Sequence, residues 1–158
     1  MGPLRITPGD LGDRRVVELL GLHLRQCRAE TAPGSAHALD LEGLRAPGIS
    51  FWTAWEADLL VGTGALQRLS AEHGEVKSMH TAPAARRRGI GRAMLDHLVA
   101  VARGQGMTRL SLETGSRDYF KPAHALYLSR GFVDCPPFAD YVPDPNSRFL
   151  TLDLRAGT

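Results

Sequence analysis

Hydrophobic positions along the chain recur with two different periods, and the two periods together predict a mixed α+β protein. Apolar residues at 16, 17, 19, 20, 22 and 24 follow the helical period, and Pro33 and Gly34 then interrupt it. The broken helical pair that results is either the mobile wall of a substrate cleft or an ordinary helix–loop–helix packed on a sheet. Helices are expected over Asp10–Glu30, Leu39–Leu44, Ala93–Arg103 and Pro122–Arg130.

Alternating or continuous apolar runs bounded by Gly, Pro, Asn or Asp predict seven strands. Gly62 and Gly64 lie inside one of these runs and indicate a bulge or a close backbone neighbour. Pro136 and Pro137 should spoil the sixth strand midway. The element order is β-α-α-β-β-β-α-β-α-β-β, with helices on both faces of one sheet. The expected strands are Leu4–Thr7, Ile49–Trp55, Leu59–Leu69, Glu75–Thr81, Arg109–Thr114, Phe132–Phe138 and Arg148–Leu154.

The composition narrows the class of protein. A length of 158 residues predicts a single domain over residues 1–158. A net charge of +2, from 19 basic and 17 acidic residues, argues against a nucleic-acid binder. No apolar run approaches the roughly 20 residues of a membrane span, and the N-terminus lacks a signal-peptide pattern. Two cysteines are too few for a disulfide framework, so a cytoplasmic protein is expected.

Metal chemistry is not indicated either. The six histidines are scattered, without a His-x-x-x-His or Cys-x-x-Cys grouping. Cys135 has no His partner that the sequence places beside it, which favours a buried structural thiol over a nucleophile.

A basic glycine loop lies between the fourth strand and the following helix. Arg86, Arg87 and Arg88 come just before Gly89, Ile90, Gly91 and Arg92 at the helix start. The first turn of a helix leaves backbone N–H groups without intrahelical partners, and its dipole adds positive charge there. The loop therefore predicts a site for an anion, most simply a phosphate group. It is neither a Walker loop nor a Rossmann fingerprint.

Three regions together resemble the GNAT superfamily of N-acetyltransferases. The loop matches the Arg/Gln-x-x-Gly-x-Gly/Ala pattern for acetyl-CoA, and Pro83 precedes it at the expected place. The segment Ala123–Phe132 resembles the family signature Ala-x-x-Leu-Tyr-x-x-x-Gly-Phe. Segments after Glu113 also resemble a bacterial subgroup of the YsnE type. The resemblance implies the GNAT acyl-CoA N-acyltransferase fold, in which strands four and five splay apart.

The resemblance implies acetyl-CoA as co-substrate and no metal. Backbone groups of Met79, His80 and Thr81 would hold the pantetheine arm, and the loop from Arg86 to Arg92 would hold the pyrophosphate. Phe120 and Ala123 fall at cofactor-contacting positions. Phe120 stands where many members carry a pantetheine-binding Asn, which puts that one hydrogen bond in doubt.

The resemblance also assigns catalytic roles. Tyr127 would protonate the departing thiolate with a phenol of ordinary pKa, about 10, or would only fill core space. Glu75 would be the general base, by its spacing from the loop, or a solvated carboxylate beside Lys77. Glu113 and water are the other candidates for the base. A regular strand would put His80 on the face opposite Glu75.

The expected activity is acetyl transfer from acetyl-CoA to a primary amine of a small molecule, amino acid or peptide. The alternatives are another acyl-CoA donor or hydroxyl acceptor, or a non-catalytic coenzyme A sensor. The family resemblance also allows for a homodimer. Residues that would line the acceptor cleft, or else serve as core and edge-strand residues, are Trp52, Trp55, Phe138, Tyr141 and Arg148.

Overall fold

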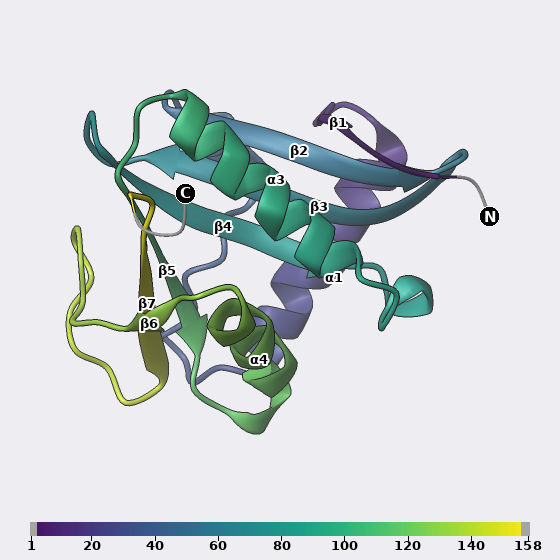
Figure 1. Ribbon diagram of the computed structural model, residues 1–158. Helices are drawn as coiled ribbons and strands as arrows, with labels where there is room; N and C mark the ends of the chain where they lie inside the picture. The colour runs from purple at the N-terminus through teal and green to yellow at the C-terminus, as the bar shows by residue number, and fades with distance from the viewer. Residues whose placement is uncertain (1–2, 156–158) are drawn as a thin grey trace.

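A computed structural model describes residues 3–155 of the chain, and its centre is one seven-stranded sheet in the order β1-β2-β3-β4-β5-β7-β6 (Figure 1). All neighbouring strands are antiparallel except β4 and β5, which are parallel. The strands are β1 (Leu4–Pro8), β2 (Ile49–Glu56), β3 (Leu59–Arg68), β4 (His73–Thr81), β5 (Arg109–Gly115), β6 (Val133–Asp134) and β7 (Ser147–Asp153).

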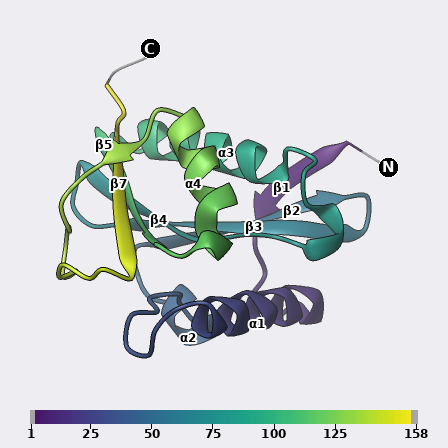
Figure 2. The same ribbon diagram turned by 90° about the horizontal axis from the view of Figure 1, so that it is seen from below.

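Helices cover both faces of the sheet. Figure 2 shows α1 (Arg14–Ala29) and α2 (Leu41–Leu44) on one face and α3 (Ile90–Gly104) on the other. The fourth helix, α4 (Lys121–Ser129), follows β5 and a 3₁₀ turn. Asp13 caps α1 by accepting a hydrogen bond from the backbone N–H of Arg15, which satisfies one of the donors at the helix start. The element order, the mixed sheet and the two helical layers confirm the predicted α+β architecture.

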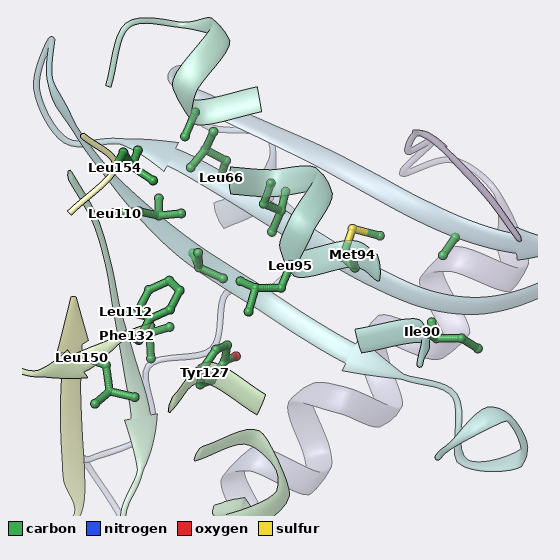
Figure 3. Close-up of a cluster of buried hydrophobic side chains, with 14 of the residues drawn as sticks. Leu66, Ile90, Met94, Leu95, Leu110, Leu112, Tyr127, Phe132, Leu150 and Leu154 are labelled. Atoms are coloured by element: carbon green, nitrogen blue, oxygen red, sulfur yellow. The ribbon is translucent and has the colours of Figure 1, made fainter. Parts of the chain in front are cut away.

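The larger hydrophobic core lies between α3 and the sheet. Leu95 and Leu98 of α3 are fully buried in one cluster with the strand residues Leu110 and Leu112. Figure 3 labels Leu95, Leu110 and Leu112 in this cluster. A side-chain carbon at Gly64 would lie 2.6 Å from Cγ of Met94, so this glycine lets α3 approach the sheet closely. The close neighbour of Gly64 is thus a side chain and not backbone, and the bulge that was the other expectation lies at this glycine.

Two irregularities of β4 shape the centre of the molecule. Pairing with β5 ends after Glu75 and Ser111, so the rest of β4 up to Thr81 has no strand partner on that side. The predicted splay of strands four and five is confirmed. The register with β3 also shifts between Thr63 and Ala65, where Ser78 has a φ of 54°. This bulge places two residues of β4 opposite one of β3 and bends the strand.

The bulge overturns one expectation about side-chain direction. A regular strand would put His80 on the face opposite Glu75, but the extra residue at Ser78 reverses the alternation. Val76 and Met79 pack into the core on the α3 side, while His80 meets His23 of α1. His80 therefore shares the α1 face of the sheet with Glu75.

The sixth strand is much shorter than expected. The sequence predicts a strand over Phe132–Phe138, whereas β6 contains only Val133 and Asp134. Pro136 and Pro137 have no backbone N–H to donate to a sheet ladder, which explains the early end. The chain then forms a long loop that returns to β7 and brings Tyr141 back over the sheet.

Candidate active site

A pocket of about 110 Å³ lies beside the unpaired edge of β4. Its floor comes from β4 and β5, and α1 and α4 contribute His23, Cys27, Ala123 and Tyr127. The loop after α1 contributes Thr31 and residues 35–38, so this loop is a wall of the pocket. That this wall is mobile and borders a substrate stays a prediction. Tyr141 closes the remaining side from the loop before β7.

Glu75, Lys77 and Tyr141 form a buried polar cluster in this pocket. Glu75 is only 3% exposed, and its Oε2 accepts a hydrogen bond from the Tyr141 hydroxyl at 2.6 Å. Lys77 Nζ donates to the same oxygen at 3.2 Å and to the Tyr141 hydroxyl at 3.1 Å. The carboxylate of Glu75 is therefore buried and paired, and not the solvated strand-end group that the sequence left open.

Tyr141 is held in place by aromatic neighbours. Phe138 packs edge-on against it at 5.1 Å between ring centroids, and His37 does so at 5.0 Å. Burial, and then the charge of Glu75, raise the pKa of Tyr141. Its hydroxyl therefore keeps its proton and acts as a donor to Glu75.

Tyr127 lies on α4 with its side chain in the main core and at the pocket (Figure 3). It is 6% exposed, and burial raises its pKa well above the ordinary value. The expectation of an ordinary phenol pKa is therefore wrong, because the sequence gave no measure of desolvation. The phenol stays protonated throughout the neutral range, as a proton donor must.

Glu113 is the second carboxyl group of the pocket. Burial raises its pKa from the usual value, because desolvation disfavours the charged form. A carboxyl group with a raised pKa is better matched to proton transfer near neutral pH than an exposed one.

His23 of α1 and His80 of β4 meet beneath the pocket. Their Nδ1 atoms lie 3.2 Å apart, so one ring donates its Nδ1 proton to the other and the two rings carry different tautomers. Burial lowers the pKa of His23 to about 4 and that of His80 to about 3. Cys27 Sγ lies 3.7 Å from His23 Nδ1, and burial raises the pKa of this thiol to about 11.

This histidine pair should make the fold sensitive to mild acid. Both folded pKa values lie below the unfolded value near 6.5, so the unfolded chain binds more protons between pH 6.5 and 4. The stabilisation is complete above pH 6.5 and is lost as the pH falls toward 4. The lowering of the His23 pKa from 6.5 to about 4 corresponds to about 3 kcal/mol in the free energy of unfolding.

Urea unfolding at pH 7 and pH 4.5 measures this loss. In His23→Gln the loss of unfolding free energy between pH 7 and pH 4.5 should fall by half or more. In Cys27→Ser this loss should stay the same. An unchanged difference in His23→Gln would show that other groups cause the acid sensitivity.

The basic loop lies at the far end of β4. Gly89 has a φ of 78° and is the N-cap of α3, with no side chain capping the first turn. Arg86, Arg87 and Arg92 are exposed there. Arg88 instead donates to Glu56 Oε1 at 2.6 Å, which ties the loop to the end of β2.

The remaining expected residues divide between the pocket and the core. Met79, Phe120 and Ala123 line the pocket. Ile90 is buried in the first turn of α3, and Thr81 and Gly91 are half-buried. A side-chain carbon at Gly115 would lie 2.1 Å from the Phe120 ring, so this glycine lets the ring pack over the end of β5.

Of the residues considered for the acceptor cleft, Tyr141 alone lines the pocket. Trp55 is buried in the core under α1, and Trp52 packs against His97 of α3 with ring centroids 4.4 Å apart. Arg148 forms an ion pair with Asp134 at the sheet edge, at 2.8 Å. These three residues therefore serve packing and edge charge.

Several pocket residues were missed by the sequence analysis. Cys27, Ser35 and His37 carry no motif, and only the break after α1 hinted that this region mattered. Lys77 was placed beside Glu75, because it follows Glu75 by two positions and so shares its face of β4, but it was given no role in the pocket.

Among residues 3–155, no group of three or more His, Cys, Asp or Glu side chains is arranged to hold a metal ion. Within the same range no helix is long and apolar enough to cross a membrane.

The fold and the pocket agree with a family match. Residues 17–132 match the model of the Acetyltransferase (GNAT) family, so the chain belongs to this family. Two relatives extend the match over most of the chain. Uncharacterized N-acetyltransferase YsnE of Bacillus subtilis is 49% identical over 96% of this chain and 100% of its own length. Uncharacterized N-acetyltransferase YedL of Escherichia coli is 47% identical, over 94% of each chain.

Solved structures share the fold. An acyl-CoA N-acyltransferase from Klebsiella pneumoniae superposes with a TM-score of 0.77 at 27% identity, covering 96% of this chain and 97% of its own. YncA of Salmonella typhimurium, solved with acetyl-CoA, gives a TM-score of 0.71 at 18% identity, over 98% and 95% of the two chains. The chain is therefore an acetyl-CoA-dependent acetyltransferase with the GNAT fold.

Proposed function

We propose that this enzyme transfers the acetyl group of acetyl-CoA to a primary amine of a small molecule, amino acid or peptide, by direct attack in a ternary complex. The observation that carries the proposal is the unpaired edge of β4 beside the pocket. Backbone groups from Val76 to Thr81 on that edge have no strand partner, so they are available to an extended ligand.

The residues at hand fit acetyl-CoA. Met79, His80 and Thr81 would bind the pantetheine arm along the open edge of β4. The amides of Ile90, Gly91 and Arg92 have no capping side chain and would bind the pyrophosphate together with Arg86 and Arg87. Arg88 would support the loop through its bond to Glu56. Phe120 and Ala123 would contact the arm from the α4 side of the pocket.

In the transfer step a C–N bond forms between acceptor and acetyl group while the C–S bond breaks. Tyr127 would give its proton to the thiolate that leaves, since its phenol is protonated and lines the pocket. Burial of the site strengthens such a hydrogen bond. The pocket also holds the acceptor next to the thioester, which converts a bimolecular reaction into a reaction between neighbours.

The proton of the attacking amine needs an acceptor. Glu75 is buried on β4, the strand beside the pocket, but its Oε2 already accepts hydrogen bonds from Lys77 and Tyr141. Glu113 has the raised pKa expected of a base near neutral pH. We retain Glu75 as the first candidate, with Glu113 and water as alternatives that Glu75→Gln and Glu113→Gln would separate by their kcat values.

Binding of acetyl-CoA is tested by thermal and chemical unfolding. At 100 times its Kd, acetyl-CoA should raise the free energy of unfolding by about 2.7 kcal/mol, because it binds only the folded chain. Arg92→Ala should show a smaller gain, while Arg28→Ala, on the exposed side of α1, should match the wild type. No stabilisation by acetyl-CoA would contradict the assignment of the β4 edge and the loop.

A further inference from the structure

The pocket beside β4 is small and largely covered. One water molecule needs roughly 10–15 Å³ of cavity volume. The pocket volume of about 110 Å³ therefore holds on the order of ten groups of the size of a water molecule. The two covering loops touch each other: Asn146 Nδ2 donates to Ser35 Oγ at 3.5 Å, and His37 packs on Tyr141. A small-molecule acceptor fits this space.

The charges that line the pocket are unequal. Glu75 and Glu113 supply two carboxyl groups, whereas Lys77 is the one lysine or arginine among the described lining residues. Lys77 is already bound to Glu75 and to Tyr141. His23 adds no positive charge near pH 7, because burial lowers its pKa to about 4. With both carboxyl groups ionised, Glu75, Glu113 and Lys77 leave an excess of one negative charge. Burial raises the pKa of Glu113, so this carboxyl group is the one that a cationic ligand such as an ammonium group stabilises most in its charged form.

One buried hydroxyl of the pocket has no partner among the described residues. Ser78, at the bulge of β4, is 7% exposed and lines the pocket. Its Oγ forms no hydrogen bond with the described residues. A buried hydroxyl normally finds a partner, so an unpaired one beside a cavity indicates a ligand that supplies a donor or acceptor. An amine can supply such a donor.

Resting on the proposed acetyl transfer, we infer that the acceptor is a small amine that carries no carboxylate, and that Glu113 excludes the corresponding amino acids. A carboxylate in this pocket would lie near Glu113 with no free cation to pair with, in surroundings where like charges repel more strongly than in water. An ammonium group is instead attracted by the excess negative charge before it loses its proton and attacks. This selection works by repelling the wrong substrate as much as by attracting the right one.

Matched acceptors test the inference on the wild-type enzyme. Each set contains an amino acid, its amide and the amine that lacks the carboxyl group, for instance alanine, alaninamide and ethylamine. The amide is less basic than the amino acid and the amine is more basic, so a shared advantage of both cannot come from basicity. The amide and the amine should each exceed the amino acid in kcat/KM by tenfold or more.

The variant Glu113→Gln should reduce that preference at least fivefold, while Glu42→Gln, an exposed carboxylate on α2, should leave it unchanged. If Glu113→Gln turns over too slowly to measure, protection against thermal unfolding by amide and by acid, in the presence of coenzyme A, gives the same comparison.

The outcomes separate the two claims. Equal turnover of amino acids and amides overturns the selection by charge but keeps acetyl transfer to amines. If none of the acceptors supports the release of coenzyme A, the proposed transfer itself is overturned, and the inference with it. An unchanged preference in Glu113→Gln overturns the assignment of the selection to Glu113.

Discussion

Tyr127→Phe is expected to lower kcat for acetyl transfer by about 10²–10⁴-fold, the usual contribution of a positioned proton donor. The change removes one oxygen from a side chain that is 6% exposed and otherwise leaves the ring in the core. KM for acetyl-CoA should change little, because the hydroxyl acts on the leaving group and not on the binding of the arm. Steady-state release of coenzyme A thiol measures both constants.

Tyr119→Phe is the matched control for this loss. The Tyr119 hydroxyl donates to Gln26 Oε1 at 3.2 Å on the exposed surface, so its removal should leave kcat within about twofold of the wild type. Full kcat in Tyr127→Phe would assign the phenol to packing alone, which is the second role that the sequence left open.

Glu75→Ala is expected to destabilise the fold by about 3–5 kcal/mol, because it leaves the ammonium group of Lys77 buried without its counter-charge. The Lys77 side chain is 10% exposed, and its ammonium group also donates to the Tyr141 hydroxyl. Urea unfolding at pH 7 measures the loss. Glu75→Ala/Lys77→Met should recover much of it, since the double variant removes both charges of the pair.

An exposed ion pair provides the comparison. Glu42→Ala breaks the pair with Arg45 on α2, where the carboxylate is 84% exposed, and should cost less than about 1 kcal/mol. A cost of the same small size in Glu75→Ala would mean that Lys77 reaches water in the folded chain, and the cluster would then contribute little to stability.

The sequence predicted the elements better than their irregularities. The apolar stripe of α3, the glycines of its loop and the proline before it lie within one short stretch, so local periodicity and turn chemistry were enough. Gly64 on β3 indicated a bulge, but nothing within β4 located the extra residue at Ser78, because a strand with one extra residue has the same composition as a regular one. Because of that single extra residue, His80 lies on the same face of the sheet as Glu75.

Contacts between distant parts of the chain were the other gap. Tyr141 reaches Glu75 across 66 positions, and His23 meets His80 across 57. Neither pair shares a motif, and both depend on how the loops and α1 cover the sheet. The pocket could therefore be anticipated from Glu75 and Tyr127, whereas its roof and its charge balance required the fold.

Mass spectrometry of the products tests acetyl transfer most directly. With acetyl-CoA and a small amine that lacks a carboxylate, the enzyme should yield the N-acetylated amine in equal amount to the free coenzyme A thiol, and Tyr127→Phe should slow both together. Thiol release without any acetylated amine, across a full panel of small amines, would contradict transfer to an amine and leave only hydrolysis of the thioester.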